Sequence, residues 1–216
     1  MAPAEEKTAE TTTESPATDI ITVFDDPINF THKHPLQHKW CVWFDSAQGK
    51  QNQKNWMDNL KNLVTFDSVE DFWGIMNHIM KASALPAGSN YHVFKEGIQP
   101  MWEDPQNKKG GKWVVSITKK HRGQMDTWWL NTLMGMIGEA FEDGAEIMGA
   151  VVSARRSYDR ISLWTKTGAI QDVQERIGKQ FKQIMGVDSD ITLGYQMHDT
   201  ALKTNSSYGN DDIYQV

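Results

Sequence analysis

The sequence predicts a single α+β domain in which seven or eight short strands combine with three amphipathic helices. Short segments rich in β-branched and aromatic residues recur between turn residues along the chain after residue 38. Three longer segments instead repeat apolar residues every three or four positions, which is the helical period. With 216 residues the chain is long enough to bury a substantial core.

The net charge of −6 is concentrated at the N-terminus, since residues 1–34 hold seven acids and two lysines. This region is rich in Thr, Glu, Ala and Pro, so it cannot bury enough apolar surface to offset chain entropy. We therefore predict a disordered acidic tail over 1–33 and a folded domain over 34–216. The folded part is close to neutral, which argues against a broad nucleic-acid coat but permits a local basic site.

Cys41 is the single cysteine, which excludes an intramolecular disulfide framework and a cysteine-based zinc site. Because no apolar segment opens the chain, the composition indicates a reducing intracellular setting. No run of eighteen apolar residues occurs, so no membrane span is expected. His32, His34 and His38 lie close in sequence, but no Cys or acid cluster accompanies them, and no metal site or cofactor is predicted.

Alternation and turn residues predict strands over 39–45, 60–66, 90–94, 112–119, 149–155, 160–166, 191–197 and 212–216. The first two are expected to pair across a long connection. A tight turn over 156–159 joins the fifth and sixth and brings Arg155 close to Arg160. Two guanidinium groups at one turn could hold phosphates. Alternatively, either one alone is a surface arginine without a partner.

The predicted helices cover 68–81, 126–143 and 170–185. Ser68 is a typical N-cap, with Asp71 three residues later. Gly135 and Gly138 lower the stability of the second helix, which indicates close packing on a sheet. Trp73 falls outside the apolar stripe of the first helix, so it either covers a strand edge or marks a partner site.

The loop over 97–111 contains the strongest candidate for a ligand site. Trp102 offers a flat apolar face and Glu103 an anionic edge, a combination that suits guanine, which has a π-face and adjacent N–H donors. The competing interpretation is that Trp102 covers neighbouring core and Glu103 is solvated.

Enzyme classes find little support in the sequence, and no catalytic residue is predicted. It contains no phosphate-binding P-loop and no nucleophile with a supporting base. Glu103 and Asp104 are adjacent, so they need not face one substrate as a glycosidase pair would. A carbohydrate-binding module could use tryptophan platforms, but neutral sugars would not require Arg155 and Arg160.

A set of motifs between about His34 and His198 resembles the eukaryotic translation initiation factor 4E family, the mRNA cap-binding proteins. These motifs are His34-Pro35-Leu36, Trp40-x-x-Trp43-Phe44, Val69-Glu70-Asp71-Phe72-Trp73, Gly97-Ile98-x-Pro100-Met101-Trp102-Glu103-Asp104, Lys108-x-Gly110-Gly111-x-Trp113, Gly149-Ala150-Val151-Val152, Ile161-x-x-Trp164-Thr165 and Gly194-Tyr195-Gln196. The resemblance implies a curved antiparallel sheet of about eight strands with three helices on its convex face.

The resemblance also implies the function, which is to bind the 7-methylguanosine 5′ cap of mRNA without catalysing a reaction. Trp56 and Trp102 would stack on the base, Glu103 would accept from guanine N1–H and N2–H, and the Trp102 backbone N–H would meet O6. The other cap-binding positions that it implies are Arg155, Arg160, Lys112 and Lys203 for the phosphates and Trp164 for the N7 methyl.

A second surface would recruit an initiation scaffold protein of the factor 4G type, or 4E-binding repressors, through a short helical motif. The matching positions are His34, Pro35, Val69, Trp73, Leu130 and Met134. Asn131 stands where the family usually has an acid. The resemblance further implies a monomer that works in the cytoplasm, with the nucleus as a second compartment and no membrane association. A repressor-type paralogue is the alternative within the family.

Overall fold

The computed structural model describes residues 20–46, 59–204 and 210–216. The chain divides into two units, Met1–Lys33 and His34–Val216. In the first unit, the backbone N–H groups of Thr31 and His32 donate to the carbonyl of Ile21 and close a run of turns.

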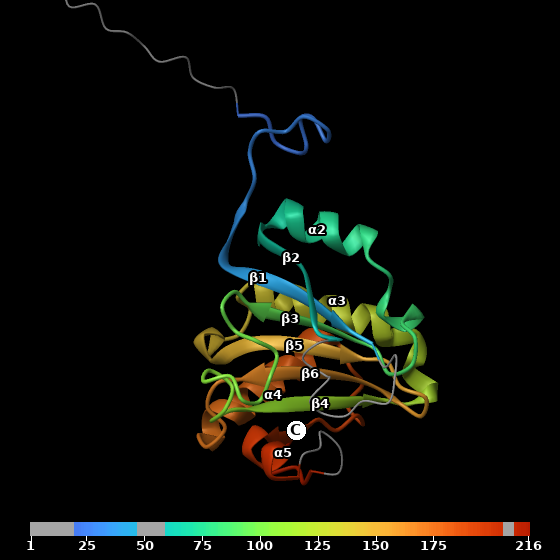
Figure 1. Ribbon diagram of the computed structural model, residues 1–216, viewed down its shortest axis with the longest axis vertical. Helices are drawn as coiled ribbons and strands as arrows, with labels where there is room; N and C mark the ends of the chain where they lie inside the picture. The colour runs from blue at the N-terminus through green and yellow to red at the C-terminus, as the bar shows by residue number, and fades with distance from the viewer. Residues whose placement is uncertain (1–19, 47–58, 205–209) are drawn as a thin grey trace, which may run out of the picture. The chain divides into compact units, whose positions relative to one another are not determined.

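Eight strands form one antiparallel sheet in the order β2-β1-β3-β5-β6-β4-β7-β8 (Figure 1). Their bounds are Pro35–Asp45 (β1), Lys61–Ser68 (β2), Asn90–Lys95 (β3), Gly111–Ile117 (β4), Ile147–Ser153 (β5), Asp159–Thr165 (β6), Gly194–Met197 (β7) and Tyr214–Gln215 (β8). The predicted pairing of the first two strands is confirmed, because β1 and β2 are antiparallel neighbours.

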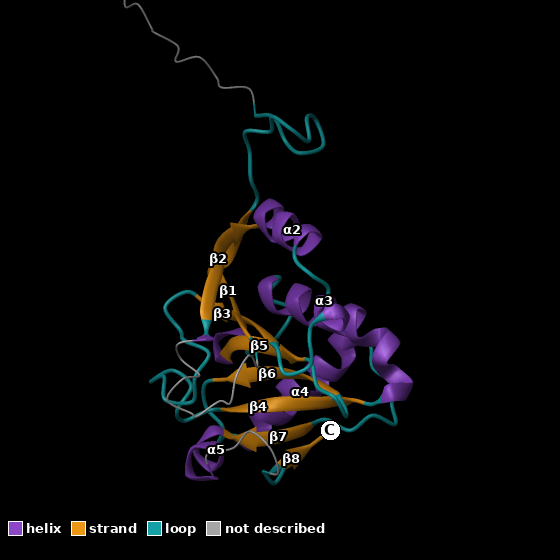
Figure 2. Cartoon of the chain, turned by 45° about the vertical axis from the view of Figure 1, so that its right-hand side comes forward, coloured by secondary structure: helices purple, strands orange, loops and turns teal. Residues whose placement is uncertain are grey.

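The α-helices of the described residues are Val69–His78 (α2), Met125–Ile137 (α3), Gln171–Met185 (α4) and His198–Thr204 (α5). In Figure 2, α2 and α3 lie to one side of the strands and α5 lies to the other. Three short 3-10 turns complete the described elements, over Ala82–Ala84, Lys119–Gln124 and Gly144–Glu146. None of the helices in the described ranges is long and apolar enough to cross a membrane.

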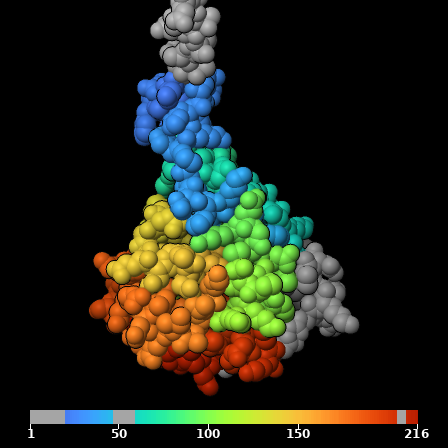
Figure 3. All heavy atoms as spheres, turned by 90° about the vertical axis from the view of Figure 1, so that its left-hand side faces the viewer, coloured from blue at the N-terminus to red at the C-terminus, as the bar shows by residue number. Residues whose placement is uncertain are grey.

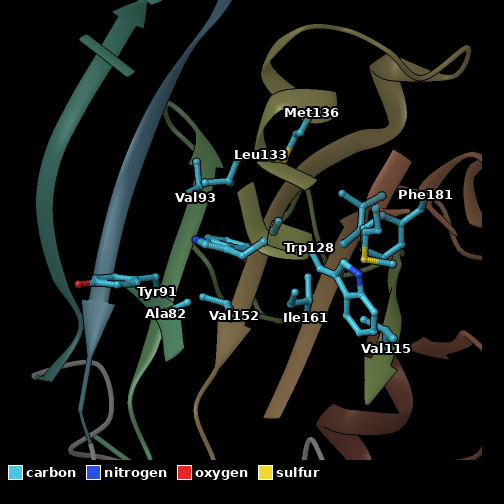
Figure 4. Close-up of a cluster of buried hydrophobic side chains, with 14 of the residues drawn as sticks. Ala82, Tyr91, Val93, Val115, Trp128, Leu133, Met136, Val152, Ile161 and Phe181 are labelled. Carbon is cyan, nitrogen blue, oxygen red and sulfur yellow. The ribbon is translucent and has the colours of Figure 1, made fainter. Parts of the chain in front are cut away.

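The main core fills the space between the sheet and helices α3 and α4 (Figure 4). Val152 and Ile161, on neighbouring strands, are fully buried there, as are Leu133 of α3 and Phe181 of α4. Alternation along each strand sends every second side chain into this core and the others to the opposite face. The predicted class, a curved antiparallel sheet of eight strands with helices on its convex face, is confirmed.

Helix α3 differs from its prediction in length and in what it packs against. It ends at Ile137 rather than at Asp143, because Glu139 adopts a positive φ of 54° that no helix continues through. Gly135 allows close packing, as expected, but against a helix and not the sheet. A Cβ there would lie 2.5 Å from Ile184 Cγ2 on α4.

The predicted start of α2 is confirmed, because the backbone N–H of Asp71 donates to the Ser68 hydroxyl over 3.1 Å. The seventh predicted strand is shorter than expected, since β7 begins at Gly194 instead of residue 191. Residues 198–204 were predicted as loop but form α5, which buries His198 and Ala201. A segment of seven residues with only two buried positions is too short to show apolar residues at helical spacing in the sequence.

Candidate functional site

The loop between β3 and β4 is held rigid by its own side chains. The side-chain amide of Asn107 is fully buried and donates to the carbonyls of Gln99 (2.8 Å) and Met101 (2.9 Å). The Asp104 carboxylate accepts from the backbone N–H of Gln99 and of Gln106. These bonds fix the loop on both sides of Trp102, so its position does not depend on packing of the indole alone.

Trp102 lies half-buried over a small apolar cluster on the concave face of the sheet. This cluster is separate from the main core and consists of Phe94, Met148, Val151 and Trp164, with Ile98 and Trp102 packed against it. The Phe94 and Trp164 rings meet edge-on, with centroids 5.3 Å apart. Trp102 therefore covers apolar neighbours and still keeps part of its surface exposed, so ligand binding by its ring stays a prediction.

Glu103 is exposed and makes no hydrogen bond or ion pair with any part of the chain that the structure describes. Within the same ranges, the backbone N–H of Trp102 has no acceptor. An anionic acceptor and an N–H donor thus stand side by side next to the indole. Together they present the polar pattern complementary to a guanine edge.

The Gly-Gly pair that ends the loop lets it run directly into the sheet. A Cβ on Gly110 would lie 1.8 Å from the carbonyl oxygen of Thr165 on β6. A Cβ on Gly111 would lie 2.5 Å from the carbonyl oxygen of Gln196 on β7. Because only glycine fits at these contacts, β4 can enter between β6 and β7 and place Lys112 opposite Trp164.

Lys112 is a cationic residue of this face that is almost completely buried, with only 6% of its surface exposed. Burial, together with the charges of Arg160 and Arg155, lowers the pKa of its ammonium to about 8. Three cationic side chains therefore lie near one another, and the repulsion among them would be relieved by an anion. The resemblance implies the same three positions for the phosphates, and their role there stays a prediction.

A buried polar network on the same face holds Arg155. Its Nη1 donates to the carbonyls of Ala154 (2.8 Å) and Ser89 (3.2 Å), and its Nη2 donates to Asn90 Oδ1 (2.8 Å). The Asn90 amide nitrogen in turn donates to both oxygens of Asp45, each at 2.9 Å. His92 Nε2 lies 2.6 Å from Asp45 Oδ1. This network was not predicted from the sequence, although polar residues at alternate positions of β3 were a possible signal.

Arg160 faces the same side of β6 as Trp164, four residues further along the strand. Its guanidinium carbon lies 5.1 Å from the centroid of the Tyr158 ring, and its Nη2 donates to the Tyr158 hydroxyl over 3.3 Å. Arg155 and Arg160, which are predicted to lie close together, flank the 156–159 turn of this hairpin. A hydrogen bond holds the backbone of the turn in place. Arg155 N–H donates to the buried Asp159 carboxylate over 2.7 Å.

His198 is a further residue of this face that was not predicted from the sequence. Its ring lies 4.1 Å from that of Trp164, and its Nδ1–H donates to the carbonyl of Asn107 over 2.9 Å. Burial lowers the pKa of His198 to about 3, Lys112 acts in the same direction, and the bond to Asn107 opposes both. The neutral ring therefore joins the Trp102 loop to α5.

Two of the predicted cap-binding residues, Trp56 and Lys203, are treated differently by the structure. Trp56 lies outside the described residues. Lys203 lies on α5 with its side chain largely exposed, and its ammonium pairs with Asp199 over 3.2 Å. Lys112, Arg155, Arg160, Trp102 and Trp164 are the predicted residues that the structure gathers on one face. In the described ranges, no group of three or more His, Cys, Asp or Glu side chains could hold a metal ion.

Figure 3 shows residues around 96–110, in green, beside residues of about 145–165, in yellow to orange, with the C-terminal residues in red below them. Hydrogen bonds confirm this arrangement, since Gly168 N–H donates to the Lys109 carbonyl over 2.9 Å and His198 N–H to the Gly110 carbonyl over 3.0 Å. The loop is therefore attached to two different parts of the chain.

The residues predicted for partner binding lie on or beside α2 and α3. Val69 is 38% exposed, Trp73 39% and Met134 38%, while Leu130 packs on the main core. Trp73 contacts Phe72 edge-on at 5.2 Å, so it rests on the core without entering it.

The ends of this second surface are fixed by polar contacts. His34 and Pro35 are exposed, and the Glu70 carboxylate lies 2.6 Å from His34 Nδ1. The Asn131 side chain donates to the Met185 carbonyl over 3.0 Å, at the end of α4. The family's usual acid at that position could not donate this bond, because an ionised carboxylate only accepts.

Comparison with known proteins gives consistent family matches. A family model described as eukaryotic initiation factor 4E matches residues 35–213. Eukaryotic translation initiation factor 4E of Aplysia californica is 45% identical over 181 residues, which cover 82% of this chain and 83% of that protein. Eukaryotic translation initiation factor 4E-1 of Zea mays is 45% identical over 177 residues, or 82% of this chain and 79% of that protein.

Solved structures give the same result. C. elegans eIF4E-3, in complex with the 4E-binding protein Mextli and a cap analog, matches with a TM-score of 0.77 and 38% identity, covering 86% of this chain and 100% of that one. Ascaris suum eIF4E-3 in complex with the m7G cap matches with a TM-score of 0.77 and 41% identity, covering 86% of this chain and 98% of that one.

Proposed function

Because this chain belongs to the eukaryotic initiation factor 4E family, we propose that it binds the 7-methylguanosine 5′ cap of mRNA and recruits an initiation scaffold protein. One observation carries the proposal. A half-exposed indole, an unengaged carboxylate and a cluster of three cations converge on one face of the sheet, at Trp102, Glu103 and around Lys112. This is the set of groups that a methylated guanine with phosphates requires.

The base binds by stacking on Trp102, with Trp56 on its other face. Methylation at N7 places positive charge on the guanine, so an indole face gains cation–π energy beyond ordinary stacking. Trp164, buried against Phe94 and beside Trp102, meets the methyl group. The rigid loop limits the conformational entropy lost on binding, which favours affinity.

The guanine edge is recognised by Glu103 and the Trp102 backbone. The carboxylate accepts from N1–H and N2–H as a charge-assisted pair, and the N–H donates to O6. Adenine lacks this pattern, because it has no donor at N1 or C2. A site whose acceptor is left unpaired by the wrong base discriminates strongly against that base.

The phosphates bind to Lys112, Arg155 and Arg160. Arg155 is oriented by Asn90, and Arg160 is supported by the Tyr158 ring. Lys112 gains most from an anion, because its buried ammonium has no carboxylate in contact within the described residues. Lys203 is the weakest of the predicted contacts, since Asp199 already pairs with it.

The partner surface lies around Trp73 on α2. Partners of the factor 4G type and 4E-binding repressors would present a short amphipathic helix whose apolar residues meet Val69, Trp73, Leu130 and Met134. The C. elegans relative was solved with a 4E-binding protein, which supports a protein-docking role for this family fold. Because Asn131 is engaged by the Met185 carbonyl, the polar part of the contact relies on Glu70 and the His34–Pro35 segment.

We assign a binding role without catalysis, in the cytoplasm and also in the nucleus. The relatives are named as initiation factors, which supports this assignment over a cap- or sugar-processing enzyme and over a repressor-type paralogue. The domain boundary at residues 33 and 34, with a disordered acidic tail before it, remains a prediction, as does a monomeric state.

Retention on immobilised 7-methyl-GTP tests the proposal directly. The protein should be retained, elute with free 7-methyl-GTP and resist elution by GTP at the same concentration. Glu103→Gln is the matched variant, because it keeps shape and loses the charge, and it should elute early. Equal elution by the two nucleotides would reject cap recognition.

A further inference from the structure

Tyr158 is a large aromatic residue that the proposed cap site uses only as a support for Arg160. It lies in the turn between β5 and β6 and is 42% exposed. The turn itself is fixed, because the buried Asp159 accepts from the Arg155 N–H at 2.7 Å and pairs with Arg122 Nε at 3.2 Å. A fixed backbone that presents an exposed ring costs little entropy when a ligand binds to that ring.

Strand alternation places Tyr158 in line with the cap site. Residues two apart face the same side of a strand, so Trp164, Ser162 and Arg160 form one row on the concave face. The contact of Arg160 with the Tyr158 ring, at 5.1 Å, shows that this tyrosine extends the row. At roughly 6.6 Å for every two residues, the row runs from the base end, past the phosphate-binding arginine, to Tyr158.

The chemistry along this row follows the order of a capped RNA. Trp164 lies at the base, Arg160 at the phosphates, and the next group of the ligand is the first nucleotide of the transcript. That nucleotide carries a base with two π-faces, which stack on aromatic side chains with little dependence on sequence. Arg156 is exposed in the same turn and adds a positive charge near the following phosphodiester.

We propose that Tyr158 is the stacking platform for the base of the first transcribed nucleotide, supported from one face by Arg160. This rests on the proposed cap-binding function and extends its ligand from a mononucleotide to the dinucleotide m7GpppN. The hydrogen bond from Arg160 to the Tyr158 hydroxyl fixes the ring relative to the phosphate site. The competing role for Tyr158 is only to hold Arg160 in place, and the two roles give different binding patterns.

The test compares three ligands with wild type and two variants. The ligands are 7-methyl-GTP, m7GpppA and m7GpppU, of which the last two have equal charge and differ in stacking strength. Tyr158→Leu keeps an apolar chain beneath Arg160 and removes the π-face, whereas Tyr158→Phe keeps the ring and removes only the hydroxyl. Ser157→Ala, in the same turn, is the control for local backbone effects.

For Tyr158→Leu we expect affinity for m7GpppA to fall about fivefold or more, while affinity for 7-methyl-GTP stays within twofold. The preference of wild type for m7GpppA over m7GpppU should disappear in this variant and persist in Tyr158→Phe and Ser157→Ala. If Tyr158→Leu lowers the affinity for all three ligands by the same factor, the tyrosine only positions Arg160 and the proposal is wrong. Unchanged m7GpppA binding would also reject it. Failure of wild type to prefer 7-methyl-GTP over GTP would instead reject cap binding itself.

Discussion

Arg155 donates a hydrogen bond from Nη2 to Oδ1 of Asn90 across 2.8 Å, and this bond sets the direction of the side chain that we propose binds a phosphate. The Asn90 amide cannot turn around, because its nitrogen donates to both oxygens of Asp45. A carboxylate accepts but does not donate, so the amide oxygen must face the arginine. On the concave face, Asp45 thus fixes the orientation of Asn90, and Asn90 fixes that of Arg155.

Asn90→Ala should weaken binding of 7-methyl-GTP about tenfold, because Arg155 loses the partner that orients it. GTP binding should weaken by the same factor, since both nucleotides carry the same phosphates. Fluorescence titration with the two nucleotides measures both changes. A change in the ratio of their affinities would mean that Asn90 acts on the base rather than through Arg155.

Lys112 makes cap affinity depend on pH. Because the pKa of Lys112 is about 8 in the free protein, its side chain is mostly protonated at pH 7 and largely neutral at pH 9. Phosphates favour the ammonium, so affinity is full below pH 8 and falls as pH rises, by about tenfold between pH 7 and pH 9. Lys112→Arg should remove this component, because a guanidinium stays charged throughout.

The difference between the two pH profiles is the quantity to measure, because ionisations of the ligand affect both proteins equally. Titrations of 7-methyl-GTP at half-unit steps from pH 7 to pH 9 give both curves. Parallel curves for wild type and Lys112→Arg would show that Lys112 does not titrate in this range or does not meet the phosphates.

His198 should make the fold sensitive to acid. Its pKa is lowered to about 3 in the folded state, whereas the unfolded chain takes up the proton near pH 6.5. Stability is therefore full above pH 6.5 and is lost as pH falls toward 3, by about 3 kcal/mol at pH 4 from this group alone. Urea unfolding of wild type and His198→Asn at pH 7 and pH 4 measures the effect.

In His198→Asn, the side-chain amide can donate to the Asn107 carbonyl in place of the histidine Nδ1–H, but an amide does not titrate. The variant should be less stable at pH 7, because its smaller side chain leaves space beside Trp164. Its loss of stability between pH 7 and pH 4 should be smaller than that of wild type. An equal loss would place the acid sensitivity in other groups.

Trp73→Ala should abolish binding of a scaffold-type helical peptide and leave 7-methyl-GTP affinity unchanged. The side chain is 39% exposed and touches Phe72 only edge-on, so its removal exposes little core. An aromatic residue central to such a patch contributes about 2 kcal/mol or more to binding. Pull-down on the peptide and on cap resin gives the two readouts.

Ile170→Ala is the matched control, because Ile170 is an apolar side chain 52% exposed on another surface. It should leave both readouts unchanged. If Trp73→Ala loses cap binding together with the peptide, the two surfaces are not independent.

The exposure of Trp73 follows from sequence, because its helix already has an apolar stripe without it. Periodicity also locates the strands and the 156–159 hairpin, since these patterns depend only on neighbours in the chain. The end of α3 does not follow, because it depends on the positive φ of Glu139. Helix α5 is too short for a period, and its stability comes from burying His198 and Ala201.

The same distinction applies to the candidate site. Trp102, Glu103 and the cations could be identified because each lies in a recognisable local motif. The contacts of Asn90 and His198 do not follow from such motifs, since their partners Arg155 and Asn107 are 65 and 91 residues away in sequence. Such contacts depend on which strands become neighbours, and a single sequence does not determine that order.

Titration of 7-methyl-GTP and GTP, followed by quenching of tryptophan fluorescence, tests the central claim most directly. The two ligands share their phosphates and differ in the charge of the base, so the ratio of their affinities isolates stacking on charged guanine. Cation–π attraction of roughly 1–2 kcal/mol predicts that 7-methyl-GTP binds about tenfold tighter or more. Equal affinities would contradict recognition of the cap by this face.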